Sequence, residues 1–354
     1  MSPENFEQDQ FDEFDKYDLY AMEFEPVIQN RQARRKRKPK QQHIAKVSEE
    51  EMFAAMAERV AGIEGEFTTT YKFGRYEEEW LLNALRKFYE EELIVDILAS
   101  IKGGKEASVY RCQGHETLGK DLVAAKVYRP RRFRNLSNDA MYRQGRRTLD
   151  ADGKPPQRKD HRISRAIDKK TDFGVQVQHT SWLQYEFTTM KRLYEAGGSV
   201  PEPISAGSNA ILMDYIGDEY EAAKTLNHIR LDEDEAQALF KEVQRNIELM
   251  LDHGLIHGDL SAYNILYWEG EITLIDFPQI VQLRTNSDAE FILKRDLNRI
   301  CQYFIKQGVD CDPDDMMADI WYRYMESDYN WQADEIQRVM SAEMVNLVDD
   351  DDDE

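Results

Sequence analysis

The sequence predicts an α+β protein, built either as one large two-part domain or as two ordinary domains. Several long stretches have apolar residues at three- and four-residue spacing, which is typical of helices with one buried face. Between them stand short runs of β-branched and aromatic residues separated by glycine-containing turns, which indicate an antiparallel sheet. The length of 354 residues and a hydrophobic content of 41% are sufficient for a sizeable core.

Both ends of the chain are expected to be disordered tails. Residues 1–45 alternate acidic-aromatic and polybasic stretches without helical or strand periodicity. The last six residues, DDDDDE, are all acidic, and we expect an acidic disordered tail over 346–354. The formal net charge of −22 disfavours general affinity for nucleic acid, but residues 31–40 contain seven basic side chains and no acid, so local patches must be weighed separately.

The first half of the chain predicts helices followed by the start of a sheet. Helical periodicity covers residues 49–60 and 76–98, and we expect residues 46–98 to form N-terminal helices that pack on the sheet. Two strand-like runs follow, one opening at Ile101 and one over 122–128, and together they resemble a hairpin.

A long hydrophilic insertion then interrupts the pattern. Residues 129–178 are rich in Arg, Lys, Gly and Asp and are too long and polar for an ordinary buried connection, so we expect a flexible basic arm. Its segment 129–170 holds 14 basic and 5 acidic residues.

The second half predicts two further helices and a hairpin before a helical C-terminal region. The expected elements are a helix over 181–195, a strand over 211–217, a helix over 233–253, strands over 264–268 and 271–275, and helices over 288–348. The Glu269-Gly270 dipeptide between the two short strands is a turn signal.

The sequence disfavours secretion and membrane insertion. No stretch approaches 18 uninterrupted apolar residues, and the first thirty residues lack the order of a signal peptide. The three cysteines, Cys112, Cys301 and Cys311, form no CxxC motif and are odd in number, which disfavours a disulfide framework or a cysteine zinc site. A cytoplasmic location is expected.

The strongest chemical signal is the run His257-Gly-Asp-Leu-Ser-Ala-Tyr-Asn264 followed by Ile275-Asp276-Phe277. It supplies a carboxylate at Asp259, an amide at Asn264 and a second carboxylate at Asp276. Phosphoryl transfer requires a carboxylate to orient the acceptor and oxygen ligands for Mg²⁺, because charge on the phosphate oxygens must be neutralised. We therefore predict Asp259 as a catalytic residue and Asn264 and Asp276 as metal ligands.

A lysine upstream is suited to bind the phosphates of a nucleotide. Lys126 stands in a strand of small and β-branched residues and would direct an ammonium group toward them. Its expected partner is Glu186 on the following helix, because a carboxylate would hold the ammonium in place and keep it protonated. Glu195, nearer the end of that helix, is the competing partner.

The run Gly103-Gly104-Lys105-Glu-Ala-Ser108-Val109-Tyr110 precedes this lysine. Glycines in such a turn allow backbone amides to approach phosphates, although the run is neither GxGxxG nor a Walker A motif. Lys105, Ser108 and Val109 are candidate nucleotide contacts, with the Ser108 hydroxyl as a donor to phosphate.

The motifs GGKEASVY, AAKVY, VPEPI, ILMDYIG, HGLIHGDLSAYNIL and IDFPQ, in this order, resemble the RIO family of atypical protein kinases over residues 77–307. The resemblance implies a two-lobed protein-kinase-like fold with a reduced C-lobe. It divides the chain into an N-lobe at 99–212 and a hinge with C-lobe at 213–345. It also implies that Met213 lies behind the adenine pocket and that the backbone of Asp214, Tyr215 and Ile216 meets adenine.

The resemblance leaves three functions open. The first is ATP- and Mg²⁺-dependent phosphorylation of serine, including self-phosphorylation, with an unknown protein substrate. The second is an ATPase switch that forms an aspartyl-phosphate at Asp276 and acts in ribosome or RNA assembly, with the basic segments 31–40 and 129–170 contacting RNA or a pre-ribosomal particle. The third is transfer of phosphate to a small molecule, because related HGD and IDF motifs occur in aminoglycoside and choline kinases.

One departure from ordinary protein kinases bears on the substrate. Pro278 stands where those enzymes have the glycine after the Asp-Phe pair, and it fixes φ and removes a backbone donor. No APE-like segment follows, so docking of a peptide substrate stays open. The RIO subfamily also stays open, because GGKEASVY resembles one branch of the family and IDFPQ the other.

Overall fold

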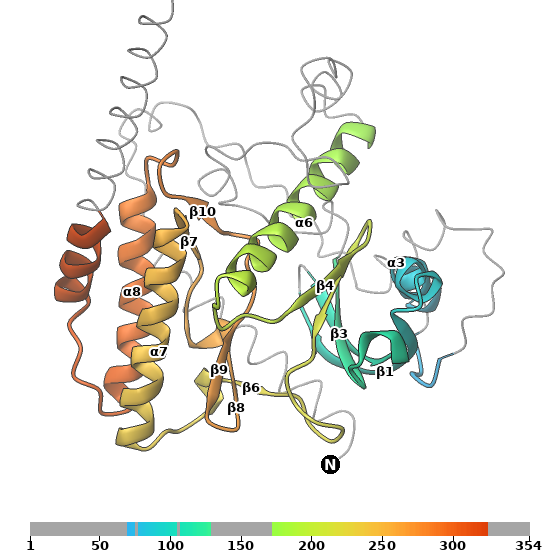
Figure 1. The fold of residues 1–354 in the computed structure, drawn as a ribbon, viewed down its shortest axis with the longest axis horizontal. Helices are drawn as coiled ribbons and strands as arrows, with labels where there is room; N and C mark the ends of the chain where they lie inside the picture. The colour runs from blue at the N-terminus through green and yellow to red at the C-terminus, as the bar shows by residue number, and fades with distance from the viewer. Residues whose placement is uncertain (1–68, 75–76, 105–106, 129–171, 325–354) are drawn as a thin grey trace, which may run out of the picture. The chain divides into compact units, whose positions relative to one another are not determined.

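The computed structural model describes residues 69–74, 77–104, 107–128 and 172–324 (Figure 1). The chain divides into two compact units, Met1–Arg86 and Lys87–Glu354, and the arrangements below are those within the second unit. The predicted α+β class is confirmed: a five-stranded antiparallel sheet precedes a region of long helices.

The first described helix, α3 (Glu78–Glu90), is shorter than predicted, because helical structure was expected as far as residue 98. The chain leaves the helix at Glu92, whose φ of 53° lies in the left-handed region. The Leu93 amide then donates to the Phe88 carbonyl at 2.8 Å, which is the bond pattern of a Schellman motif. Strand β1 begins at Ile94, so the helical prediction is wrong for residues 94–98.

The main sheet has the order β1-β2-β3-β5-β4, with each neighbouring pair antiparallel. Its strands are β1 (Ile94–Gly103), β2 (Ala107–Gly114), β3 (Leu122–Tyr128), β4 (Pro203–Ala206) and β5 (Ala210–Asp214). The predicted hairpin is confirmed as the regular pairing of β2 with β3 from Ala107↔Tyr128 to Gln113↔Leu122.

Helix α6 (Asp172–Glu195) follows the sheet's third strand and is longer than the predicted helix over 181–195. Residues 172–178 were assigned to the basic insertion and are helical instead, because the polar composition of this stretch conceals its continuity with the amphipathic part of α6. The rest of the insertion, residues 129–171, lies outside the described residues.

The helical region begins with α7 (Glu233–Asp252), whose N-cap Asp232 accepts a hydrogen bond from the Glu235 amide at 2.9 Å. The second long helix is α8 (Ala289–Lys306), and residues 313–324 are also helical. The smaller elements between and before these helices are β6 (Lys224–Thr225), η4 (Leu226–His228), β7 (Leu255–Ile256), η5 (Ala262–Asn264), β8 (Ile265–Trp268), β9 (Glu271–Leu274) and β10 (Val281–Gln282).

The predicted hairpin around the Glu269-Gly270 turn is confirmed by the pairing of β8 with β9. Both turn residues have positive φ, 49° and 87°, as a two-residue turn of type I′ requires. This hairpin separates the two motifs of the candidate site, because Asn264 precedes it and Asp276 follows it.

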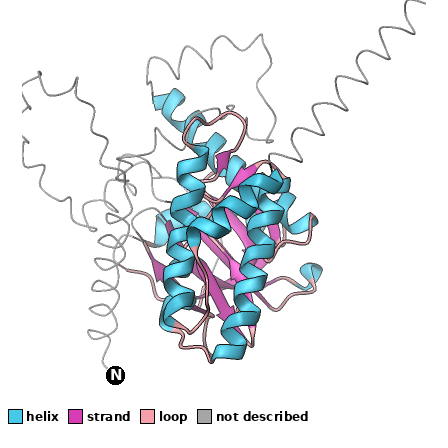
Figure 2. Cartoon of the chain, turned by 90° about the vertical axis from the view of Figure 1, so that its left-hand side faces the viewer, coloured by secondary structure: helices cyan, strands magenta, loops and turns pink. Residues whose placement is uncertain are grey.

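One hydrophobic cluster joins the sheet, α6 and the helical region. Ile211 of β5, Leu183 of α6 and Val243 of α7 all belong to it and are fully buried. Phe240 of α7 and Phe304 of α8 bring the two long helices together with ring centroids 5.1 Å apart. Figure 2 shows long helices in front of the strands.

Polar bonds also attach α6 to the helical region. Gln282 of β10 donates to the Tyr185 hydroxyl at 2.7 Å. Nearer the C-terminal end of α6, Arg192 donates to His253 at 3.0 Å. Beyond the helix, the Ser199 amide donates to the Asn246 side chain on α7 at 2.7 Å. The helix is thus held along its length by elements that follow it in sequence.

Within the described ranges, no helix is long and apolar enough to cross a membrane.

Candidate active site

The strand register places three predicted nucleotide contacts on one face of the main sheet. Lys126 of β3 lies opposite Val109 of β2 and opposite Ile211 of β5. Met213, two residues further along β5, lies opposite Ala124. Because residues directly opposite one another, and residues two apart in a strand, share a face, Val109, Lys126 and Met213 point to the same side of the sheet.

The register does not bring the Ser108 side chain to this face. Ser108 lies opposite Val127, so it points to the other side of the sheet, and it is buried. Because a strand alternates faces at every residue, Ser108 does not share the face of Val109 and Lys126, and its role as a hydroxyl donor to phosphate stays a prediction. Lys105, the other candidate in the turn, lies outside the described residues.

Lys126 forms the ion pair expected with α6. Its Nζ lies 2.8 Å from Oε1 of Glu186, and both side chains are buried. The other oxygen, Oε2, accepts a hydrogen bond of 2.5 Å from the Tyr128 hydroxyl. Glu195, the competing carboxylate, is paired instead with Lys191 on the same helix. Glu186 is thus held at both oxygens.

Lys126 also contacts the second carboxylate of the site. Its Nζ lies 2.6 Å from Oδ1 of Asp276, so one ammonium joins β3, α6 and the segment after β9. Burial by itself would lower the pKa of Lys126, but the charges of Asp276 and Glu186 outweigh it and raise that pKa well above its usual value. Burial would raise the pKa of Asp276, whereas Lys126 lowers it overall. Both groups are therefore charged at neutral pH.

Asp276 has a left-handed backbone with φ of 72°, which aspartate tolerates better than most residues. Its side chain is 41% exposed, far more than those of Lys126 and Glu186. The carboxylate is thus held by Lys126 at one oxygen and still reachable from solvent.

Asp259 is held at both of its oxygens. Arg299 of α8 contacts Oδ1 at 2.7 Å, and the Asn264 amide donates to Oδ2 at 3.1 Å and to the Asp259 carbonyl at 2.8 Å. Because the Asn264 nitrogen is turned toward Asp259, its amide oxygen points away from that carboxylate.

Helix α8 also holds the backbone just before Asp259. The Gly258 amide donates to Asp296 at 2.8 Å, and Arg295 donates to the Gly258 carbonyl. Gly258 has φ of 82°, and a Cβ there would lie 2.2 Å from the Gln279 carbonyl oxygen. Only glycine therefore allows the loop to pass this close to the segment after Asp276.

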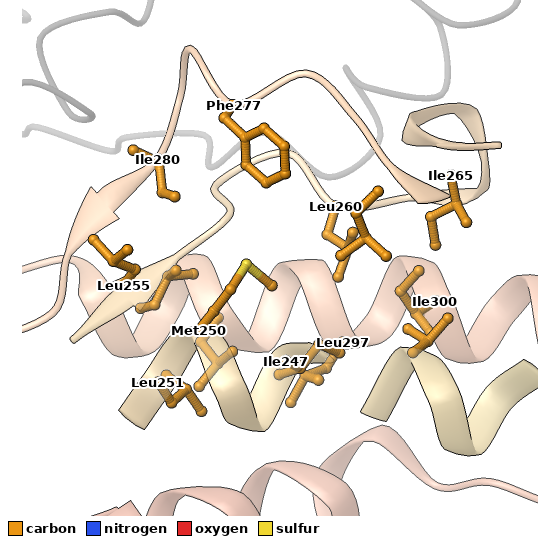
Figure 3. Packing of buried hydrophobic residues seen from close by; sticks show 14 of the residues in the cluster. Ile247, Met250, Leu251, Leu255, Leu260, Ile265, Phe277, Ile280, Leu297 and Ile300 are labelled. Atoms are coloured by element: carbon orange, nitrogen blue, oxygen red, sulfur yellow. The ribbon is translucent and has the colours of Figure 1, made fainter. Parts of the chain in front are cut away.

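His257 connects the two motifs as a structural residue. It accepts the Asp259 amide at Nδ1, 3.3 Å away, and its Nε2 lies 3.1 Å from the Ile275 carbonyl. Its ring lies 5.0 Å from that of Phe277. Phe277 and Leu260 face the packed side chains of α7 and α8 (Figure 3). These contacts make His257 a link between the catalytic-loop motif and the segment that carries Asp276.

The segment predicted as the hinge joins β5 to the helical region. The Asp214 side chain lies 2.6 Å from Nζ of Lys120, which also contacts Glu202. The Arg111 guanidinium stands 5.8 Å from the centre of the Tyr215 ring. The Ile216 carbonyl accepts the Ala223 amide at 2.9 Å. The adenine-binding role of this backbone stays a prediction.

The donor set suits the metal that the sequence predicts. The predicted ligands Asn264 and Asp276 carry hard oxygens, and they stand just before β8 and just after β9. Mg²⁺ is usually held by one or two such side chains together with phosphate oxygens and water. In the described part of the chain, no group of three or more His, Cys, Asp or Glu side chains forms a denser metal cluster. The site therefore fits a metal that arrives with a nucleotide.

Sequence reasoning missed several residues of this site. Tyr128 is only two residues beyond Lys126 and so shares its face of the strand, a signal that the alternation of the strand contained. Arg295, Asp296 and Arg299 stand about forty residues after Asp259, and no spacing rule connects them with it. Their role depends on the packing of α8 against the loop.

The two basic segments proposed to contact RNA, residues 31–40 and 129–170, lie outside the described residues.

Comparison with known proteins identifies a domain of the same kind. The model of the RIO domain matches residues 146–316. The chain is 30% identical over 234 residues to the RIO-type serine/threonine-protein kinase Rio1 of Haloferax volcanii, an alignment that covers 66% of this chain and 71% of that protein.

In two further relatives the alignment covers a smaller part of the relative's own length. The serine/threonine-protein kinase RIO1 of Chaetomium thermophilum is 29% identical over 65% of this chain and 42% of its own length. The Rio2 kinase of Methanocaldococcus jannaschii is 33% identical over 42% of this chain and 56% of its own length.

Proposed function

This chain belongs to the RIO family of serine/threonine protein kinases, and from that premise we propose that it transfers the γ-phosphate of ATP to serine, including serines of its own chain. The observation that carries the proposal is the position of Lys126, whose ammonium contacts both Glu186 and Asp276. A lysine held by two carboxylates, one buried and one exposed, suits a site where phosphate and metal arrive together.

Each chemical task of phosphotransfer has a residue in this proposal. Lys126 binds phosphate oxygens while Glu186 keeps it in place. Asn264 and Asp276 hold Mg²⁺, which supplies neutralisation of phosphate charge. The hinge backbone over Asp214, Tyr215 and Ile216 contacts adenine, with Val109 and Met213 on the sheet face above it.

Asp259 orients the acceptor. Its carboxylate accepts a hydrogen bond from the serine hydroxyl, whose oxygen bonds to the γ-phosphorus as the bond to the β-phosphate oxygen breaks. The hydroxyl proton leaves through Asp259, and ADP is the other product.

A second candidate is an ATPase switch with an aspartyl-phosphate at Asp276. The exposure of the Asp276 side chain, 41%, favours it, because a phospho-acceptor must be reachable. In this form the protein would act in ribosome or RNA assembly through the basic segments 31–40 and 129–170. Transfer to a small molecule has less support, since the relatives compared above are named protein kinases.

The test is incubation of purified protein with γ-labelled ATP and Mg²⁺. Wild type is compared with Asp259→Asn, Asp276→Asn and the control Asp234→Asn, which changes an exposed carboxylate in the first turn of α7. Acid-stable label that is lost in the first two variants and kept in the control supports serine phosphorylation.

The other outcomes separate the alternatives. Label that hydroxylamine removes, with released phosphate, supports the aspartyl-phosphate switch. Transfer to choline or an aminoglycoside supports the small-molecule reaction. Full labelling of Asp259→Asn contradicts the proposed catalytic role of Asp259. For RNA, deletion of residues 1–45 is expected to weaken binding most at low salt, and unchanged binding would count against that segment.

A further inference from the structure

A buried arginine on α8 contacts the carboxylate proposed to orient the acceptor. Arg299 is 2% exposed and Asp259 is 8% exposed. Nη1 of Arg299 lies 2.7 Å from Oδ1 of Asp259, a distance typical of a charge-assisted hydrogen bond. The pair joins positions forty residues apart in sequence.

Arg299 is one of three residues of α8 that contact the loop at Gly258 and Asp259. Arg295 and Arg299 are four residues apart and share a face of the helix. Arg295 donates to the Gly258 carbonyl, and Asp296 accepts the Gly258 amide. The helix therefore fixes both the backbone before Asp259 and the Asp259 side chain itself.

The two oxygens of Asp259 have donors from opposite directions. Oδ1 accepts from Arg299 on α8, and Oδ2 accepts from Asn264 on η5. Two donors fix both the rotation of the carboxylate plane and its direction.

Arg299 also balances the negative charge of the buried Asp259 carboxylate. Asp259 and Asp296 carry two negative charges and Arg295 and Arg299 carry two positive ones, and all four side chains are buried. Loss of the Arg299 charge would leave the Asp259 carboxylate with Asn264 as its neutral donor, an arrangement that favours rotation of the carboxylate toward solvent.

We propose that Arg299 is a positioning residue for phosphotransfer, which aims the Asp259 carboxylate at the acceptor hydroxyl without touching ATP. This inference rests on the proposed kinase function. It is specific to the acceptor half of the reaction, because Arg299 contacts Asp259 and the phosphate-binding lysine contacts Glu186 and Asp276.

The test measures kcat for self-phosphorylation and, separately, the affinity for ATP by calorimetry. Arg299→Met removes the charge and keeps a similar length, and we expect kcat to fall by about 100-fold, the cost of a small misplacement of a catalytic group. ATP affinity is expected to stay unchanged. Arg299→Lys keeps the charge and one donor and is expected to recover part of the lost kcat.

The control is Arg323→Met, which removes an exposed arginine that pairs with Glu248 and Asp319 and is expected to leave kcat unchanged. In the Asp259→Asn background, Arg299→Met is expected to cause no further loss, since there is no carboxylate left to aim. A purely structural role for Arg299 would instead lower the residual turnover of that variant again.

Three results would overturn the inference: wild-type kcat in Arg299→Met, a fall in ATP affinity parallel to the fall in kcat, or a further loss in the Asp259→Asn background. If Arg299→Met does not fold, Arg299→Gln replaces it, because glutamine retains a neutral donor and is expected to show the same separation of kcat from affinity. Absence of phosphotransfer in the wild type would contradict the proposed function itself, which distinguishes the two failures.

Discussion

Tyr128 is a residue of the site whose hydrogen bond can be tested by removing one oxygen atom. Its hydroxyl donates to Oε2 of Glu186 while its ring lies against Trp182, with centroids 4.8 Å apart. Burial and the charge of Glu186 raise the pKa of Tyr128, so the hydroxyl stays protonated and keeps donating. Glu186 therefore depends on Tyr128 for its orientation toward Lys126.

We expect Tyr128→Phe to weaken ATP binding by about tenfold, because a hydrogen bond to a charged group contributes about 1.5 kcal/mol and only that bond is lost. The ring packing against Trp182 remains. Calorimetric titration with ATP and Mg²⁺ measures the change.

The matched control is Tyr303→Phe, which removes a hydroxyl that donates to the Ile229 carbonyl at 3.1 Å. It is expected to leave ATP affinity unchanged. An equal loss of ATP affinity in both variants would show that removing either hydroxyl acts only through the stability of the folded protein.

Single residues divide into those that local pattern reveals and those that it does not. The pairing of Lys126 with Glu186 followed from residue type and order. The side-chain direction of Ser108 did not, because a shift of one residue in a strand reverses the face. Arg299 could not be found from sequence, since its partner is set by the packing of a distant helix.

At the scale of elements, the end of α3 has an energetic cost that glycine would avoid. Glu92 occupies the left-handed position of a Schellman motif. We expect Glu92→Gly to stabilise the protein by about 1 kcal/mol, because a non-glycine residue in this conformation costs about 1–2 kcal/mol and the greater freedom of glycine in the unfolded chain offsets part of the gain. Urea denaturation measures the free energy of unfolding.

Glu90→Gly is the control two residues earlier, at the last residue of α3 and also exposed. There glycine is expected to destabilise the protein, by at most about 1 kcal/mol, because glycine has a lower helix propensity than glutamate. The same sign for both substitutions would contradict the role given to the left-handed position.

The contact between α7 and the loop after α6 predicts a pH dependence. Glu242 accepts from the Ser199 hydroxyl at 2.7 Å and pairs with Arg245 at 2.6 Å. Arg245, with smaller contributions from Ser199 and Asn246, lowers the pKa of Glu242. A lowered carboxylate pKa stabilises the folded state above the unfolded pKa, and this stabilisation is lost as pH falls through the folded pKa.

We therefore expect Glu242→Gln to be less stable than wild type at pH 7, with the difference shrinking as the pH falls below the ordinary glutamate value of about 4.3. Urea midpoints at pH 7 and at acidic pH give this comparison. A difference that is independent of pH would assign the effect to packing alone.

Elements were predictable where local chemistry decides them. The turn between β8 and β9 follows from Gly270, which adopts positive φ readily, and the start of α7 follows from the N-cap Asp232. The beginning of α6 and the end of α3 do not, because a polar helix start resembles a loop and a glutamate replaces the usual glycine at the helix end.

For the whole molecule, ATP binding should be visible as stability. A ligand that binds only the folded state at 100 times its dissociation constant adds about 2.7 kcal/mol. We expect ATP with Mg²⁺ to raise the melting temperature of the wild type and to have little effect on Lys126→Met, in a thermal unfolding experiment.

Lys191→Met serves as the comparison, because Lys191 is an exposed lysine of α6 whose partner Glu195 is 3.9 Å away. It is expected to keep the full shift. An undiminished shift in Lys126→Met would contradict the assignment of Lys126 to the phosphates.

The fold as a whole was predictable from the order of its motifs, which the family comparison supports. The α+β class, the antiparallel sheet and the helices after it all appear. What sequence could not give is how α6 and the segment after it are attached. Their bonds, Tyr185 with Gln282, Arg192 with His253 and Ser199 with Asn246, join residues between 47 and 97 positions apart.

That attachment has a consequence for the time course of the proposed reaction. Glu186 stands on a helix that hydrogen bonds with Gln282 and His253 hold in place, and its ion pair with Lys126 is formed in the same arrangement. No reorientation of α6 has to precede the first turnover. When enzyme and ATP are mixed rapidly, product should accumulate without a lag, and control over the reaction falls to whatever limits access of the acceptor to Asp259.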